Sequence, residues 1–139
     1  MISFKELMGS HTISEIPIGH QQNGQELLKR INIIRDAYGL AMKVTSCYRS
    51  KEEHIQIYEK LNKDREAKGL PPRTIPWASR HLEMAAVDIA DPDGKLMKWC
   101  RDNVDILEKA QVWCEDDDSV PRVHFQIFPP KSGKRFFLP

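Results

Sequence analysis

The stretch SRHLEMAAVDIADPDG, residues 79–94, carries the clearest structural pattern in the chain. Residues 85–90 are a short apolar run, which predicts a buried strand, and the Asp-Pro-Asp-Gly sequence that follows predicts a turn. Because side chains alternate between the faces of a strand, Asp88 points away from the face used by its neighbours. His81 lies in the loop before the strand, so the two side chains can converge on one point.

Helical and strand patterns both follow this turn. Apolar side chains recur at helical spacing between residues 95 and 110 and indicate one helix or two short ones. Residues 112–115 and 122–128 predict the two strands of a hairpin around an acidic loop. We expect the tail residues 136–138 to dock on the core.

A helix and a short strand are expected upstream. Residues 22–38 repeat apolar side chains at helical spacing, and Gly39 follows at the position of a helix C-cap. Residues 41–46 alternate and predict a strand. The first twenty residues lack periodicity and are interpreted as an irregular arm, with one helical turn near residues 3–8.

A second helix is predicted from the Ser-x-x-Glu capping box formed by Ser50 and Glu53. Its apolar stripe consists of Ile55, Tyr58 and Leu61. The helix is expected to end before Gly69, where a proline-rich surface loop begins.

Together these elements predict an α+β domain with a small antiparallel sheet. The chain has 139 residues, of which 40% are hydrophobic and 29% charged, and this fits a single domain over residues 1–139 with an irregular N-terminal arm at 1–20.

Composition also excludes several classes of protein. A net charge of +1 without a basic stripe argues against nucleic-acid binding. No apolar run approaches the roughly 20 residues of a membrane span, and no signal peptide is expected at the N-terminus. We therefore expect synthesis in the cytoplasm, no membrane insertion and a monomer. Cys47, Cys100 and Cys114 lack metal-binding spacing and are expected to be buried and reduced.

The residues with metal-ligand chemistry are His81, Asp88 and His124. Two imidazoles and one carboxylate are a suitable ligand set for a catalytic zinc ion that keeps one position open. Spacing alone leaves the alternative open that these histidines are ordinary surface or core residues. The other histidines, His11, His20 and His54, are interpreted as surface residues.

Three segments, in the same order, resemble the LAS-type zinc peptidases, the family of D-alanyl-D-alanine carboxypeptidases and L-alanyl-D-glutamate endopeptidases. Residues 79–88 are similar to the S-x-H-x-x-G-x-A-x-D signature, residues 45–50 to an S-x-Y-R-S segment, and residues 124–126 to the strand of the last histidine ligand. The signature positions in register are Ser79, His81, Ala86 and Asp88. The compact members encoded by bacteriophages are the most similar.

This resemblance implies a fold like that of hedgehog domains and DD-peptidases, with His81, Asp88 and His124 holding zinc, which activates a water molecule. It implies that Arg49 is catalytic or binds substrate, contacting either the substrate carboxylate or the oxyanion. Ser79 and Gln126 are the other implied substrate-binding residues.

Two positions depart from the family pattern. Met84 replaces the motif glycine, so we expect a turn built differently there. Pro121 occupies the usual position of the catalytic acid. Glu115 is the best substitute as general base, whereas Asp116 and Asp117 are interpreted as solvated turn residues.

The expected function is zinc-dependent hydrolysis of an amide bond in the peptidoglycan stem peptide. The enzyme would act on the bacterial cell wall, released by a holin or carried on the virion. The alternatives are a D-alanyl-D-alanine carboxypeptidase or dipeptidase, and a non-catalytic zinc-containing virion or binding module.

Overall fold

The buried strand predicted from the opening stretch is β2 (Ala86–Ala90), and the computed structural model describes it together with the rest of residues 1–139. Strand β2 pairs along its length with β4 (Arg122–Gln126) in antiparallel register. This register sets Asp88 directly opposite His124. The two strands form the part of the sheet on which the candidate site is built.

Helices and a five-stranded sheet make up the fold, in the strand order β1-β2-β4-β3-β5. The other strands are β1 (Val44–Ser46), β3 (Trp113–Glu115) and β5 (Phe136–Phe137). The helices are α1 (Phe4–Met8), α2 (Ile18–Tyr38), α3 (Lys51–Ala67), α4 (Lys95–Asp102) and α5 (Val104–Ala110), with short 3-10 turns η1 (Ile13–Glu15) and η2 (Arg80–Glu83). The predicted α+β class is confirmed, and residues 95–110 form the two short helices.

The sheet is mixed rather than purely antiparallel, because β5 pairs with β3 in parallel. The expectation for the tail was therefore correct in part. Phe136 packs against the core, whereas Leu138 is 82% exposed. A strand of only two residues has no periodic pattern that a sequence can reveal.

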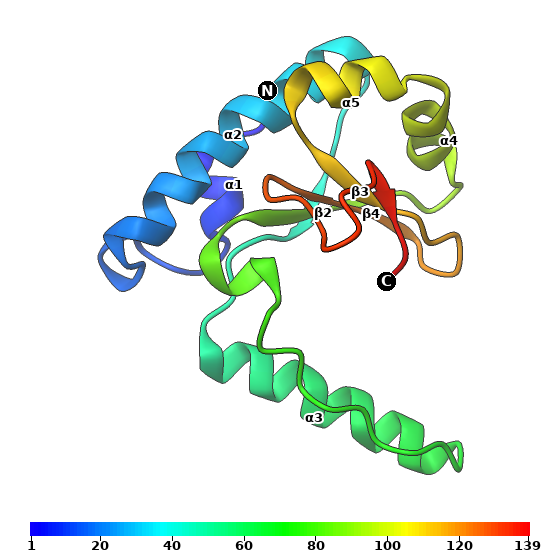
Figure 1. Ribbon diagram of the computed structural model, residues 1–139. Helices are drawn as coiled ribbons and strands as arrows, with labels where there is room; N and C mark the ends of the chain where they lie inside the picture. The colour runs from blue at the N-terminus through cyan, green and yellow to red at the C-terminus, as the bar shows by residue number, and fades with distance from the viewer.

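One face of the sheet is covered by helices and holds the hydrophobic core. Helix α2 and helix α5 lie together over this face (Figure 1). The fully buried side chains there include Leu27, Ile31 and Ile34 from α2, Val87 and Ile89 from β2, and Val123 and Phe125 from β4. Burial of such side chains contributes about 1.5–3 kcal/mol each before entropic costs.

The N-terminal residues belong to this core, so their prediction as an irregular arm over 1–20 is wrong. Ile2, Leu7 and Ile16 are buried, and α2 already begins at Ile18. The Asn32 side chain fixes the segment by accepting the Ile2 N–H and donating to the Ile2 carbonyl oxygen, at 2.8 and 3.0 Å. The helical turn expected near residues 3–8 is present as α1.

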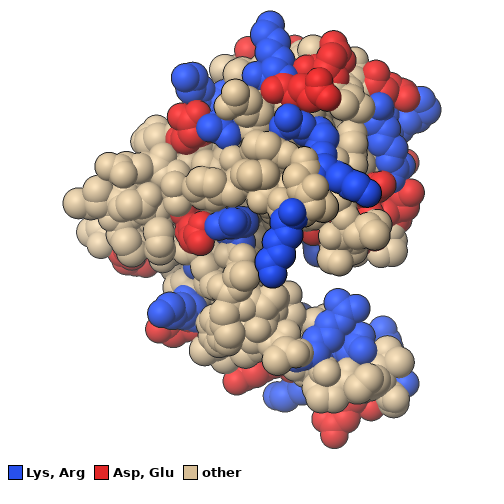
Figure 2. Space-filling model, viewed as in Figure 1, with Lys and Arg blue, Asp and Glu red and all other residues tan.

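Helix α3 extends away from the rest of the molecule (Figure 1). It begins with the predicted capping box of Ser50 and Glu53 and ends at Ala67. Figure 2 shows a notch between this arm and the main body. Ile55, Tyr58 and Leu61 of the predicted apolar stripe are partly buried, and the one fully buried side chain of the helix is His54.

Candidate metal centre

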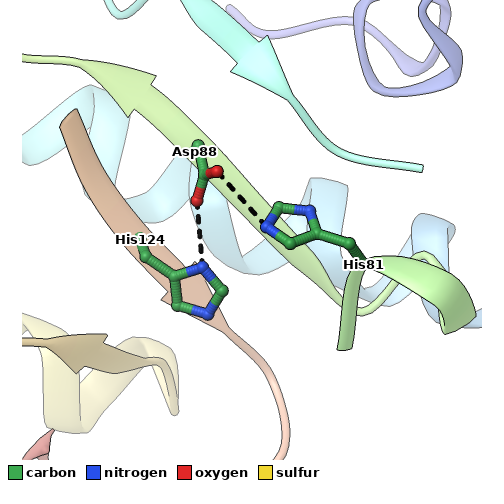
Figure 3. A group of neighbouring side chains, drawn as sticks. All are labelled: His81, Asp88 and His124. Atoms are coloured by element: carbon green, nitrogen blue, oxygen red, sulfur yellow. Dashed lines mark hydrogen bonds and ion pairs between the residues drawn. The ribbon is translucent and has the colours of Figure 1, made fainter. Parts of the chain in front are cut away.

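Three side chains from two strands and a turn converge on the open face of the sheet. Asp88 lies on β2, His124 lies opposite it on β4, and His81 comes from η2, which leads into β2 (Figure 3). The ligand atoms of the three residues all lie within 4.8 Å of one another. The carboxylate is in the middle, 2.9 Å from Nδ1 of His124 and 3.3 Å from Nε2 of His81.

The outer nitrogen of each imidazole contacts an oxygen that can only accept a hydrogen bond. Nδ1 of His81 lies 2.7 Å from the Cys47 carbonyl oxygen, and Nε2 of His124 lies 2.9 Å from Oε1 of Gln126. The Gln126 amide donates its own N–H to the Phe128 carbonyl oxygen, which fixes which end of the amide faces the imidazole. The outer nitrogens therefore carry the protons.

The inner nitrogens, Nε2 of His81 and Nδ1 of His124, face Asp88. In the metal-free protein a proton on Nδ1 of His124 is donated to the carboxylate, and a bound metal ion would take the place of that proton. A hydrogen bond from the outer nitrogen to a carbonyl or amide oxygen is the usual way in which proteins orient histidine ligands to a metal. Two nitrogen donors and one carboxylate oxygen thus share one centre, and the buried group can hold a metal ion.

The pKa values of the three groups reflect the same contacts. Burial would raise the pKa of Asp88, but the hydrogen bonds and charges of His124 and His81 outweigh it and hold the pKa of this carboxyl well below its usual range. Burial lowers the pKa of His81. It acts the same way on His124, but the contact with Asp88 prevails and raises the pKa of His124. The carboxylate is therefore ionised at neutral pH and available as a ligand.

Arg49 lies beside this group, as the sequence predicted. Its NH2 nitrogen is 3.7 Å from Oδ2 of Asp88, and its Nε donates to the Ser46 hydroxyl at 3.2 Å. The Arg49 backbone N–H donates to the His81 carbonyl oxygen at 3.2 Å. The segment that carries Arg49 is thus attached directly to the turn that carries His81.

A second arginine, Arg122, was missed at the sequence level. Its Nε lies 3.5 Å from the same Oδ2 atom of Asp88. Arg122 precedes His124 by two residues on β4, so both side chains project to the open face. Strand periodicity could have placed Arg122 on the same face as His124 once β4 was predicted, but its approach to Asp88 depends on the β2–β4 register.

Glu115 lies at the end of β3, beside the centre. The β3–β4 register pairs Trp113 with Gln126 and Cys114 with Phe125, and its continuation by one residue sets Glu115 opposite His124. Burial raises the pKa of Glu115, with the charges of His124 and Asp88 acting in opposite directions on it. A carboxylate with a raised pKa, close to the ligands but outside the ligand set, suits a general base.

The remaining acidic residues of the hairpin loop have other partners. Asp116 and Asp118 pair with Arg101, and Asp117 accepts hydrogen bonds from the backbone N–H and hydroxyl of Ser119. Pro121 is exposed, and its carbonyl oxygen accepts the Asp91 N–H. Glu115 is therefore the acid of this loop with surroundings suited to catalysis.

The two other predicted substrate-binding residues have different surroundings. Gln126 is buried and orients His124, as described above. Ser79 precedes η2, whose N-terminus its side chain does not cap. Gln126 is thus a positioning residue for a candidate ligand, whereas no hydrogen bond joins the Ser79 side chain to the cluster.

Met84 adopts the left-handed conformation, with φ 58° and ψ 33°, at the end of η2. The expectation of a differently built turn is therefore wrong, since a methionine adopts the backbone geometry that glycine favours. Its fully buried side chain packs against Gly24 of α2, where a Cβ atom would lie 2.5 Å from the Met84 sulfur. Packing of this side chain offsets the backbone strain of about 1–2 kcal/mol.

The prediction that the other histidines are surface residues is wrong for two of them. His54 is fully buried and contacts the Pro76 carbonyl oxygen through Nε2 at 3.0 Å. His11 is largely buried between Glu15 and Glu53, and the charges and hydrogen bonds of these carboxylates outweigh its desolvation and raise its pKa. Their environments depend on loops that sequence periodicity does not describe.

The three cysteines are buried and free, as expected. None of the helices combines the length and apolar character needed to cross a bilayer. Comparison of the chain with protein-family models, with curated proteins and with solved structures finds no match.

Proposed function

We propose that the protein is a zinc peptidase that hydrolyses an amide bond in the peptidoglycan stem peptide. The observation that carries this proposal is the orientation of the two imidazoles. Both outer nitrogens donate to fixed oxygen acceptors, so both inner nitrogens face the Asp88 carboxylate. Two nitrogens and one oxygen are the protein ligands of a catalytic zinc site, which keeps its fourth position for water or substrate.

The three segments that resemble LAS-type peptidases also meet in space, which supports the proposal. Ser46 of the first segment pairs with Asp88 of the second, and Asp88 pairs with His124 of the third. Residues 45–50, 79–88 and 124–126 thus surround one centre. Segments that matched by chance would have no reason to converge.

Each residue at the centre has a distinct part in the proposed reaction. A bound zinc ion supplies a Lewis acid that polarises the scissile carbonyl and makes water more acidic. Glu115 accepts a proton from the attacking water and delivers it to the departing amine. Arg49 donates hydrogen bonds to the oxygen that becomes negatively charged, or to a substrate carboxylate. Gln126 holds His124 in the required tautomer.

The notch between α3 and the main body supports action on a chain-like substrate (Figure 2). The open face of the sheet is turned toward α3 (Figure 1), so a peptide strand can approach the centre from this side. This favours an endopeptidase over a carboxypeptidase. The resemblance to phage-encoded peptidases adds the proposal that the enzyme reaches the wall through a holin or with the virion. A carboxypeptidase would need only the end of the stem peptide.

The proposal is tested by digestion of purified peptidoglycan and mass spectrometry of the products. The zinc-loaded protein should produce a new amino terminus within the stem peptide, while release of free D-alanine alone would identify the carboxypeptidase instead. Glu115→Gln should reduce the rate by about 10²–10⁴-fold and retain zinc. Asp117→Asn is the matched control in the same loop and should cleave normally.

A non-catalytic module is the second candidate, because Pro121 stands where the resembling family has its catalytic acid. A wild-type protein that binds one zinc ion and cleaves no wall preparation would establish this alternative. Equal cleavage by wild type and Glu115→Gln would instead refute the assignment of the base.

A further inference from the structure

Two guanidinium groups flank the central carboxylate of the candidate site from opposite sides of β2. Arg49 approaches from the segment after β1, and Arg122 approaches from β4. Both lie next to the same atom, Oδ2 of Asp88, at 3.7 and 3.5 Å. These distances are ion pairs rather than well-formed hydrogen bonds.

Neither guanidinium has its hydrogen-bonding capacity filled by the protein. Each arginine carries five N–H donors in a planar fork. Arg49 uses Nε for the Ser46 hydroxyl, and its side chain is only 16% exposed. Arg122 is 47% exposed and has the distant Asp88 oxygen as its ion-pair partner. Most of the donors around this carboxylate therefore remain free.

The charges of the site are also unbalanced. Asp88 is the one carboxylate in ion-pair contact with His81, His124, Arg49 and Arg122. The two guanidiniums lie 3.7 and 3.5 Å from the same oxygen atom of Asp88, so their positive charges oppose each other. A divalent cation bound to Asp88 would neutralise the carboxylate that both guanidiniums pair with. Glu115 carries one negative charge, which cannot balance the two positive charges of Arg49 and Arg122.

We propose that Arg49 and Arg122 form a two-arginine clamp that holds a carboxylate of the substrate beside the scissile bond. Arg122 is then a specificity-determining residue of the reaction. The role of the clamp in holding substrate rests on the proposed function, whereas the ability of the two arginines to bind an anion does not. A carboxylate matches the site because its two oxygens accept parallel hydrogen bonds from a guanidinium fork.

The clamp binds a peptide that has a free carboxylate close to the cleaved amide, and it binds this peptide more tightly than a neutral one. Arg49 is largely buried and would hold the carboxylate on the inner side, while the more exposed Arg122 would contact it from the solvent side. This order predicts that Arg122 discriminates between acidic and neutral substrates, since a charged hydrogen bond is stronger than a neutral one.

A metal-free experiment tests the clamp without reference to catalysis. Asp88→Asn removes the carboxylate that occupies both arginines and should free them for glutarate, used here as the probe. Titration followed by NMR of the arginine Nε–H signals should shift Arg49 and Arg122 together along one binding curve. Asp88→Asn/Arg122→Gln should bind glutarate about tenfold more weakly. Arg35→Gln, added to Asp88→Asn, is the control on α2 and should change nothing.

Equal glutarate affinity of Asp88→Asn with and without Arg122→Gln would overturn the clamp, and so would the absence of binding to both.

In the zinc-loaded protein with Asp88 intact, Arg122→Gln should weaken glutarate binding about tenfold at unchanged zinc content. If the wild type fails to bind zinc but the metal-free variants bind glutarate as expected, the peptidase proposal is wrong and the anion site is retained. If wall hydrolysis depends on Glu115 but glutarate affinity does not change on substitution of Arg122, the clamp is wrong and the peptidase proposal is retained.

Discussion

The two faces of the β2–β4 strand pair are made from alternating residues of the same two strands, yet they have opposite characters. On the helix-covered face, Val87, Ile89, Val123 and Phe125 are fully buried. On the open face the same strands present Asp88, Arg122, His124 and Gln126. A single alternating pattern therefore gives one apolar face that forms the core and one face of polar and charged side chains.

The open face is costly as a purely structural arrangement. Burying a carboxylate and two imidazoles removes them from water, and even well-paired buried charges contribute little net stability. The apolar face stabilises the fold without any such groups. A bound metal ion would offset the cost of this arrangement, and substitutions on the two faces test whether it does.

The largest effect is expected from His124→Ala on the open face. Loss of a ligand should reduce zinc affinity by more than about 100-fold, because loss of a residue that only orients a ligand already costs about 10–100-fold. Competition with a chelating dye measures this affinity. Denaturant unfolding of the metal-free variant should show a smaller loss than Phe125→Ala, and an unchanged zinc affinity would remove His124 from the ligand set.

The reciprocal change, Phe125→Ala, affects the apolar face one residue further along β4. The free energy of unfolding should fall by about 3–5 kcal/mol, because a large cavity replaces a fully buried ring. Urea titration measures the loss. The folded fraction should still bind zinc with nearly wild-type affinity, and a large drop in intrinsic affinity would show that the two faces are not separable.

A smaller effect is expected at the contact between helix α2 and the end of η2, where Gly24 packs against Met84. Gly24→Ala should destabilise the protein by about 1–3 kcal/mol, because its Cβ would overlap the buried Met84 sulfur. In the Met84→Ala background the same change should cost less, because the closest overlap is gone and Phe4, whose Cε2 atom lies 3.0 Å from the added Cβ, is the remaining tight contact. A double-mutant cycle by urea unfolding measures this coupling, and additive effects would contradict the contact.

Sequence patterns predicted the parts of the fold that repeat or cap. The apolar run before Asp91, the capping box at Ser50 and the C-cap at Gly39 each depend on neighbouring residues, and all three are present. The N-terminal segment and β5 were not predicted correctly, because their order comes from contacts with distant parts of the chain, such as that between Ile2 and Asn32.

The residues of the candidate site also divide into those that the sequence could predict and those that it could not. His81, Asp88 and His124 were found from spacing and resemblance, and the structure brings them together. The role of Gln126 in orienting His124 and the approach of Arg122 to Asp88 depend on strand register, which the sequence does not state. The conformation of Met84 depends on the space left by Gly24, a contact across 60 residues.

The most direct test is an anomalous difference map at the zinc absorption edge from crystals grown with zinc. We expect one peak, about 2.0–2.2 Å from Nε2 of His81, Nδ1 of His124 and a carboxylate oxygen of Asp88. The outer nitrogens should keep their contacts with the Cys47 carbonyl oxygen and the Gln126 amide. A peak at an outer nitrogen, a peak elsewhere on the molecule, or no peak at all would contradict a metal centre on the open face.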